Sequence, residues 1–339
     1  MPNNPTKILL SFTLVGGILI SISSNSWLGA WMGLEINLMS FIPLMSSQEN
    51  IYTTEASLKY FLVQALASSS LLFLVMMKAL MNQTIFTSNM HSYAMMTPLL
   101  MKMGAAPLHW WFPSVMEGLS WNNCLLMMTV QKSTPMMLTS YLVKTNLPTL
   151  LVILMSVTVG ALGGMNQNSL RKILTYSSIN HTGWMLAAML GSNKLWLLYF
   201  TVYSLLTSIV TFIAKSHNIS FVNQSMTMNK SAALKFMLFT TLLSLGGLPP
   251  FIGFLPKWIT IQLMIMNNMS FMVTVMVVTS LITLYYYLRI CYSSFIILYE
   301  EMKWSMWSSA KNMSILYATM LSSVSMMGLL VCTSTININ

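Results

Sequence analysis

The stretch Lys102-Met-Gly-Ala-Ala-Pro-Leu-His-Trp-Trp-Phe-Pro113 lies between long apolar segments, yet it contains a lysine, a glycine, two prolines and a histidine. A lysine at the centre of a bilayer costs roughly 2.5–3.5 kcal/mol on insertion scales. Pro107 lacks a backbone N–H and clashes with the preceding turn of a helix. Broken backbone at this depth survives only where protein covers it or where it lines a wet cavity. The alternative is a helix that ends near Gly104, with Lys102 reaching to the membrane surface.

The composition places the chain in a membrane. Of its 339 residues, 55% are hydrophobic and 6% are charged, and the mean hydropathy is +0.69. Soluble domains contain about 25% charged residues, so this chain has too few to cover a water-facing surface. The net charge of +10 is spread between apolar segments and forms no cluster or stripe of the kind that nucleic acid requires. We therefore predict an all-α polytopic membrane protein that contacts lipids and does not bind nucleic acid.

Motifs for cofactors and metals are absent from the sequence. The three cysteines, Cys124, Cys291 and Cys332, are far apart and form no C-x-x-C pair, and the chain has no Asp. There is no G-x-G-x-x-G after a strand and no G-K-[ST] loop, so we expect no nucleotide site. The 35 methionines suit core packing better than copper binding. We expect this chain to bind no metal, haem, iron–sulfur cluster or other redox cofactor itself.

Windows of about 20 apolar residues predict the membrane spans. The N-terminal window, up to Ser24, is interpreted as a retained first span rather than a cleaved signal. Eleven spans are expected, two of them interrupted, the fourth at Gly104–Pro107 and the ninth at Gly246–Pro250. The expected ranges are roughly 7–24, 26–46, 57–82, 90–112, 123–144, 148–169, 172–190, 194–215, 234–265, 270–298 and 314–334.

The two interruptions resemble one another in sequence. Met103-Gly-Ala-Ala-Pro107 and Leu245-Gly-Gly-Leu-Pro249 start at positions 103 and 245, which are 142 residues apart. A shift of 142 carries the first five spans onto spans six to ten, and five crossings is an odd number. The second copy would therefore cross in the opposite sense, as in the inverted repeats of transporters; the alternative is chance similarity between Gly/Pro-rich helices. We expect a first five-helix repeat over residues 1–145, a second over 146–299, and a C-terminal loop and last helix over 300–339.

Four charged residues lie deep inside the expected spans or at their interruptions, where charges mark function more often than anchoring. Glu35 and Lys132 lie mid-span, Lys102 precedes the first interruption, and Lys257 follows the second. The structural alternative for each is a static ion pair or a side chain that extends to the membrane surface.

Together the four charges are interpreted as a proton relay. Burial disfavours a charged ammonium, whereas a nearby carboxylate favours it, so a lysine subject to both effects can take up and release a proton. Glu35 is the only carboxylate predicted deep in a span and is the expected partner of Lys102. The second repeat has Ser177 at the matching position, without a carboxylate. The predicted relay is Glu35–Lys102–Lys132–Lys257.

Two histidines are candidate accessory groups. His181 lies mid-span in Ser177-Ser-Ile-Asn-His-Thr-Gly183, and His109 lies at the first interruption. Each is compatible with a proton relay and equally with a hydrogen bond to a neighbouring helix.

Long stretches of the chain resemble the antiporter-like subunit family of respiratory complex I (NADH:ubiquinone oxidoreductase), in its shortened, mitochondrially encoded animal form. The resemblance covers essentially the whole chain. Its most specific segments are Trp27-Leu-Gly-Ala-Trp-Met-Gly-Leu-Glu-Ile-Asn37, Glu55-Ala-Ser-Leu-Lys-Tyr-Phe61, the Lys102–Pro113 stretch, and Gly246-Gly-Leu-Pro-Pro-Phe-Ile-Gly-Phe-Leu-Pro-Lys-Trp258.

The resemblance implies more than the residues do alone. It implies a proton-translocating membrane-arm subunit in the mitochondrial inner membrane, built on two inverted five-helix repeats with a broken helix in each. The family's key residues correspond to Glu35, Lys102, Lys132 and Lys257. Electron transfer from NADH to ubiquinone, with FMN and iron–sulfur clusters, would belong to partner subunits of the enzyme. The expected contacts are neighbouring antiporter-like subunits and accessory subunits.

Two other functions fit the same architecture. A stand-alone cation/proton antiporter would need its own ion site, usually with an intramembrane acid, and here only Glu35 is available. A scaffold that spaces active subunits would have no need of four charges at membrane depth.

The basic residues predict the orientation. With eleven spans, one side of the membrane receives most of them, namely Lys7, Arg171, Lys172, Lys215, Lys230, Lys303 and Lys311, and the other receives Lys144 and Lys194. The positive-inside rule places the first side in the matrix. A tag on Asn339 should therefore be accessible to protease only from the outer side of the inner membrane. Accessibility only from the matrix side would contradict this topology.

Overall fold

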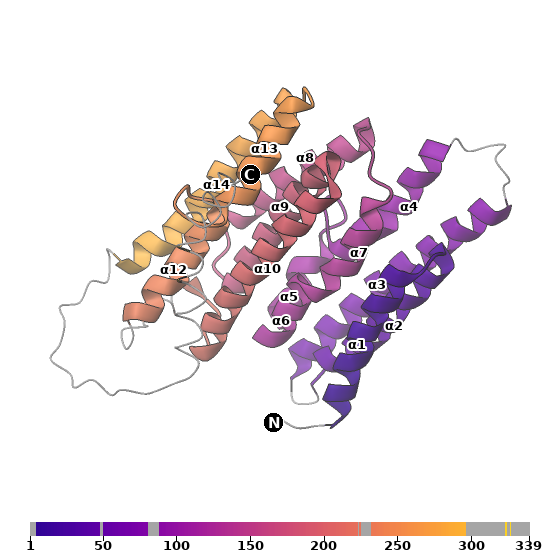
Figure 1. Ribbon diagram of the computed structural model, residues 1–339. Coiled ribbons are helices and arrows are strands. Elements are labelled where there is room, and N and C mark those ends of the chain that lie inside the picture. Colours follow the sequence, from indigo (N-terminus) through magenta and orange to yellow (C-terminus); the bar gives the residue numbers. More distant parts are fainter. Residues whose placement is uncertain are drawn as a thin grey trace. The chain divides into compact units, whose positions relative to one another are not determined.

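The computed structural model describes residues 5–47, 50–80, 88–222, 224 and 232–295, together with positions 323 and 326. Over these residues the elements are helices, and the extended pairing recorded is an isolated bridge between Ser169 and Phe221. The expected all-helical class is therefore confirmed for the described part of the chain. The chain divides into two compact units, residues 1–156 and 157–339 (Figure 1).

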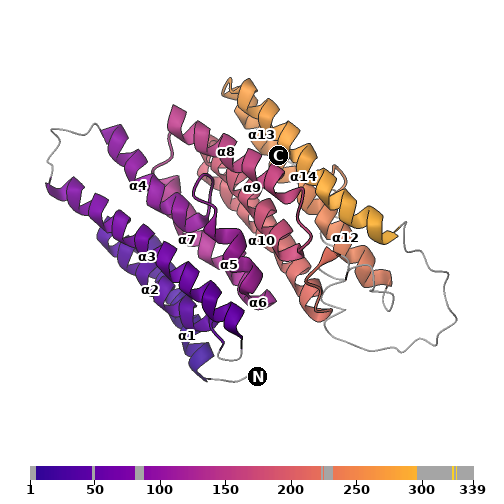
Figure 2. The ribbon, with the colours of Figure 1, turned by 180° about the vertical axis from the view of Figure 1, so that it is seen from behind.

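The first unit contains seven helices and the start of an eighth. These are α1 (Pro5–Ser23), α2 (Trp27–Met45), α3 (Ile51–Leu80), α4 (Ser88–Met103), α5 (Trp111–Gly118), α6 (Trp121–Met128) and α7 (Val130–Ser140), followed by α8 (Leu147–Gly164), which continues into the second unit. Helices α1, α2 and α3 run side by side in both views (Figures 1 and 2). Helix α7 packs against α1, α4 and α6.

The second unit contains α9 (Leu170–Gly191), α10 (Asn193–Ser216), α12 (Ala232–Gly246), α13 (Phe254–Met266) and α14 (Ser270–Phe295). Helices α9 and α10 pack together, and α13 contacts both of them as well as α14 (Figure 2). Helix α9 is buried almost throughout although it contains Ser177, Asn180 and His181. A helix this polar is stable in a membrane because protein, not lipid, surrounds it.

Six of the described helices are long and apolar enough to cross a bilayer: α1, α2, α3, α8, α10 and most of α14. Helices α12 and α13 are apolar but shorter, as expected for the two halves of a broken span. Large apolar side chains of α1, such as Leu9, Phe12 and Leu19, are exposed, which suits contact with lipid. The expected total of eleven stays a prediction, because residues 314–334 lie outside the described part except for positions 323 and 326.

Both expected interruptions are confirmed. Helix α4 ends at Met103 and α12 ends at Gly246, and the next residues, Gly104 and Gly247, have φ of +70° and +82°. This left-handed conformation is accessible to glycine without the cost that a Cβ brings. It stops each helix at the depth where the sequence pattern predicts a break.

Three boundaries differ from expectation. Helix α3 begins at Ile51 rather than near residue 57, and the second half of the fourth span continues to Gly118 rather than ending near 112. The fifth span is itself divided, because α6 ends at Met128 and α7 starts at Val130. At this division both the amide and the hydroxyl of Thr129 donate to the carbonyl of Leu125, at 3.0 and 2.8 Å. A threonine hydroxyl that competes for a helical carbonyl in this way bends helices.

Close packing of α1 on α2 depends on Gly17. A Cβ added there would lie 2.9 Å from the backbone nitrogen of Asn37 and from the carbonyl oxygen of Gly33, whereas a Cβ at Gly16 meets nothing within 4 Å. Small residues allow helix backbones to approach in this way in membranes.

We predict that Gly17→Ala destabilises the protein by about 1–3 kcal/mol, the usual cost of overpacking. The adjacent Gly16→Ala is the matched control and should be neutral or slightly stabilising, because it changes helix propensity without a clash. The measurement is the temperature at which the protein loses its native-gel band in mild detergent. Equal temperatures for the two variants would contradict the close approach of α1 and α2.

Candidate functional site

The end of α4 is closed by a Schellman motif. The amide of Gly104 donates to Met101 and the amide of Ala105 donates to Leu100, at 3.2 and 3.1 Å. The carbonyl of Met101 and that of Lys102 also accept hydrogen bonds from side chains of neighbouring helices. Trp111 Nε1 donates to the carbonyl of Met101 at 3.1 Å, and Gln64 Nε2 donates to that of Lys102 at 3.3 Å. The break therefore leaves few unsatisfied acceptors, which a membrane interior requires.

Lys102 lies in the last turn of α4 and is buried, with 7% of its surface exposed. Its side chain lines a cavity in the first unit, with about 10 Å³ open to the centre of a water molecule. The other lining residues come from α2, α3 and α7: Leu34, Asn37, Leu38, Tyr60, Gln64, Gln131, Thr134 and Pro135. Among the described residues, no hydrogen bond to Lys102 Nζ is present.

A chain of hydrogen bonds forms the wall of this cavity. Gln131 Nε2 donates to Asn37 Oδ1 at 3.0 Å, and the Tyr60 hydroxyl donates to Gln131 Oε1 at 3.2 Å. The bonds link α2, α3 and α7. Because both ends of the Gln131 amide are engaged, the amide orientation is determined and the wall is held in place.

Lys132 is the next residue along α7 and is almost fully buried, at 2% exposed. Its ammonium lies 4.6 Å from the centre of the Phe112 ring. Phe112 also packs against the break, because a Cβ at Gly104 would lie 3.2 Å from the Phe112 side chain. The aromatic face offers the cation an electrostatic attraction that strengthens away from water. Lys132 therefore lies next to the α4–α5 break, and so does Lys102.

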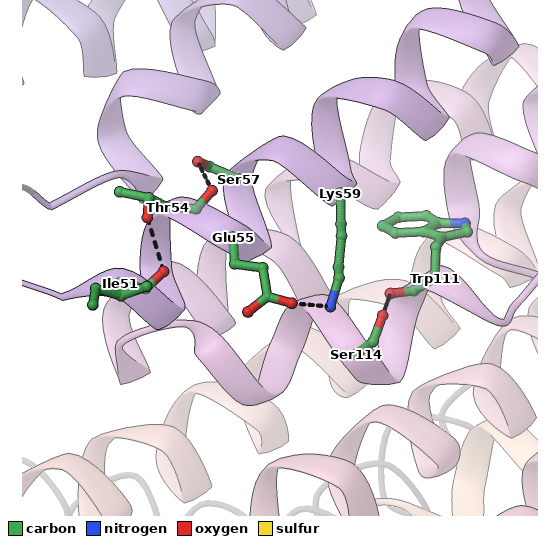
Figure 3. A network of polar contacts seen from close by, with 7 residues as sticks. All are labelled: Ile51, Thr54, Glu55, Ser57, Lys59, Trp111 and Ser114. Atoms are coloured by element: carbon green, nitrogen blue, oxygen red, sulfur yellow. Dashed lines mark hydrogen bonds and ion pairs between the residues drawn. The ribbon is translucent and has the colours of Figure 1, made fainter.

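Glu35 lies in the middle of α2, and its Oε2 atom is buried without a hydrogen-bond partner. It is close enough to Lys102 for a Coulombic interaction, but the two do not form an ion pair within 4.0 Å. The role of Glu35 as the partner of Lys102 stays a prediction. By contrast, Glu55 and Lys59 form a direct pair on exposed α3 surface (Figure 3). Such an exposed ion pair contributes little to the stability of the fold.

Lys257 lies in α13 of the second unit and is 4% exposed. Its Nζ atom donates to the carbonyl of Gly246 at 2.9 Å and, more weakly, to that of Leu245 at 3.5 Å. These are the last carbonyls of α12, so the ammonium caps the broken helix and interacts favourably with the negative end of its dipole. The ring of Trp184 on α9 lies 5.7 Å from the same nitrogen.

The two histidines have different surroundings. His181 is buried on α9, its Nδ1 lies 2.9 Å from the hydroxyl of Tyr199, and the Tyr203 ring is 5.1 Å away. His109 lies in the segment between α4 and α5, with its Nδ1 3.2 Å from the carbonyl of Pro107. The surroundings of His181 form a buried aromatic cluster, whereas His109 makes a local contact within the break.

The structure brings Glu35, Lys102 and Lys132 together in the first unit, and it places Lys257 and His181 in the second. Sequence reasoning missed the polar residues Asn37, Tyr60, Gln64, Gln131 and Thr134. Two of them could have been found from the sequence, because they lie close to candidate residues: Asn37 follows Glu35 by two positions, and Gln131 precedes Lys132. The hydrogen bonds that join these residues across three helices leave no pattern in the local sequence.

No group of three or more His, Cys, Asp or Glu side chains that could hold a metal is found in the described part of the chain. The buried lysines, the carboxylate and the histidines are groups that can take up and release protons.

The chain is similar to known proteins over most of its length. A family model described as NADH:quinone oxidoreductase/Mrp antiporter, TM, matches residues 24–283. The NADH-ubiquinone oxidoreductase chain 2 of Locusta migratoria is 46% identical over 338 residues, which cover 98% of both chains.

Two solved structures share the fold. A chain of respiratory complex I from Thermus thermophilus with bound aureothin aligns with a TM-score of 0.82 at 23% identity, over 98% of this chain and 80% of that one. A chain of the Mrp complex from Dietzia sp. aligns with a TM-score of 0.83 at 15% identity, over 96% and 75%.

The capping role of Lys257 predicts a loss of stability when the ammonium is removed. Lys257→Met keeps an apolar stem of similar length but leaves buried carbonyls of α12 without this donor, at a cost of about 1–3 kcal/mol. We expect a lower melting temperature for Lys257→Met on native gels. Lys194→Met, at an exposed position of α10, is the matched control and should melt as the unmodified protein does. Identical melting of both variants would contradict the capping role.

Proposed function

Because the chain belongs to the NADH-ubiquinone oxidoreductase chain 2 family, we propose that it is a membrane-arm subunit of respiratory complex I that moves protons across the mitochondrial inner membrane. Electron transfer from NADH to ubiquinone in partner subunits would drive that movement. The chain takes part in the activity of the enzyme through proton translocation and supplies no redox centre itself. NADH, FMN, iron–sulfur clusters and ubiquinone would bind to partner subunits.

The observation that carries the proposal is the burial of three lysines beside broken helices. Lys102, Lys132 and Lys257 are 7%, 2% and 4% exposed. A buried ammonium is costly, and loss of its proton removes that cost. Each lysine can therefore alternate between charged and neutral states when a neighbouring charge changes.

Glu35 would act as the group that biases Lys102. Its carboxylate interacts with Lys102 across a gap, without direct contact. When Glu35 is ionised, it favours the charged form of Lys102; when it is neutralised, that support is lost. The proton relay would then run Glu35–Lys102–Lys132 in the first unit and continue to Lys257 in the second, with His181 and His109 as accessory groups.

We further propose that the chain consists of two inverted five-helix repeats, 1–145 and 146–299, followed by a C-terminal segment, 300–339. The helix starts support this. Helices α1 and α8 begin at residues 5 and 147, and α3 and α10 at 51 and 193, each 142 apart. Helices α2 and α9 begin at 27 and 170, and α5 and α13 at 111 and 254, each 143 apart.

Packing contacts repeat at the same interval. An added Cβ at Gly17 would meet the backbone of Asn37, and one at Gly160 would meet the backbone of Asn180. Both members of the second pair lie 143 positions after those of the first. The left-handed glycines, Gly104 and Gly247, also differ by 143. An eleventh span and a matrix-facing N-terminus complete the proposed topology.

Other membrane-arm subunits, including neighbouring antiporter-like and accessory subunits, and lipids are the proposed contacts. The second candidate function is a stand-alone cation/proton antiporter, which the fold shared with the Mrp complex favours. That likeness is at 15% identity and concerns the fold alone. Isolation of the chain in a very large NADH-oxidising particle supports the complex I function, whereas a small particle without that activity supports the antiporter.

Substitution of Lys132 tests the relay. Lys132→Met should lower proton translocation roughly 100-fold or more, on the scale of losing a proton-transfer group, while the complex still assembles. The measurement is a pH-sensitive dye signal in proteoliposomes during NADH oxidation, with assembly checked on native gels. Lys59→Met, at the exposed pair with Glu55, is the control and should pump normally. Unchanged pumping by Lys132→Met would refute the relay.

A further inference from the structure

The cavity beside Lys102 contains a polar group that has no partner. Thr134, on α7, is fully buried, and its Oγ1 atom makes no hydrogen bond in the described structure. A buried hydroxyl without a partner is unfavourable, because it has lost its hydrogen bonds to water. Thr134 is one of the residues that line the cavity, so a ligand there is within reach of this hydroxyl.

The neighbouring residue adds a second acceptor. Pro135 lies inside α7 and also lines the cavity. Because proline has no N–H, the carbonyl of Gln131, four positions earlier, cannot accept the usual helical hydrogen bond. In membrane helices such freed carbonyls are satisfied by Ser or Thr side chains or by ordered water.

Several other polar groups of the wall are already paired. The side-chain amide of Gln131 is engaged by Asn37 and Tyr60, and Gln64 donates to the carbonyl of Lys102. The ammonium of Lys102, the Thr134 hydroxyl and the Gln131 carbonyl can bind a ligand. Together they offer both donors and acceptors, which is the pattern that suits water, and the ammonium disfavours a metal cation.

The size of the cavity limits the ligand. About 10 Å³ is open to the centre of a water molecule, close to the roughly 10–15 Å³ that one buried water needs, and a buried water typically makes about three hydrogen bonds. We propose that this cavity binds one water, held by Thr134 against Lys102. Thr134 is thus a positioning residue for the proton step between Lys102 and α7, the helix that contains Lys132. This role rests on the proposed proton translocation.

A cryo-EM map of the intact complex in lipid, at a resolution that shows ordered water, tests the site directly. We expect a peak within hydrogen-bonding distance of both Thr134 Oγ1 and Lys102 Nζ. The peak should persist in Thr134→Ser, which keeps the hydroxyl, and disappear in Thr134→Val, which has nearly the same shape. Absence of the peak from the unmodified complex, or its persistence in Thr134→Val, overturns the proposal.

Proton translocation in proteoliposomes supplies the functional readout. Thr134→Val should slow pumping by about tenfold, as the loss of about 1.4 kcal/mol of stabilisation does. Thr139→Val is the matched control, because Thr139 is also buried on α7 but does not line the cavity, and it should pump within about twofold of normal. Equal rates for the two variants count against the role of Thr134.

Failure of this proposal is distinguishable from failure of the proposed function. If Lys102→Met pumps normally, the relay is wrong, although the water peak can still be present. If the peak is absent while Lys132→Met fails to pump, the relay stands without this water. If Thr134→Val does not assemble, the maps of the unmodified and Thr134→Ser complexes decide the question.

Discussion

A helix that stops inside a membrane must satisfy the carbonyls at its end, because lipid offers no donor. Both broken helices solve this in the same way at first, with a glycine in the left-handed region and amide bonds that turn back on the last turn. In both, side chains from other helices also donate hydrogen bonds to the last carbonyls. Trp111, Gln64 and Lys257 lie where they can meet this requirement. The buried lysines need polar surroundings in turn.

The two breaks differ in what completes them. At α4 the side-chain donors are neutral, an indole and an amide. In the described part of the chain, the ammonium of Lys102 does not cap the helix, and Lys102 lines the cavity instead. At α12 the donor is the ammonium of Lys257 itself. In the proposed relay, the first unit would separate helix capping from proton transfer, whereas Lys257 would do both in the second. At the position 143 residues after Lys102, the second unit has Leu245.

The sequence predicted those features that have local causes. Glycine and proline mark the two breaks because their backbone chemistry alone produces them, and charged residues at membrane depth stand out against apolar surroundings. The division at Thr129 was missed, because threonine is common within helices and its effect depends on which carbonyl it contacts. The link between Asn37, Gln131 and Tyr60 was missed as well, since it joins residues up to 94 positions apart. Glu35 was expected as the partner of Lys102, and the two charges interact without an ion pair within 4.0 Å.

Lys257 couples charge to mechanical anchoring. The hydrogens that make its side chain cationic are the ones that fasten the end of α12 to α13. A neutral amine has one hydrogen fewer and is a weaker donor, so loss of a proton from Lys257 would weaken the attachment of α12 to α13. The broken helix is therefore more than a passive opening for polar groups. In the proposed relay, the strength of its attachment to α13 would depend on the protonation of one side chain.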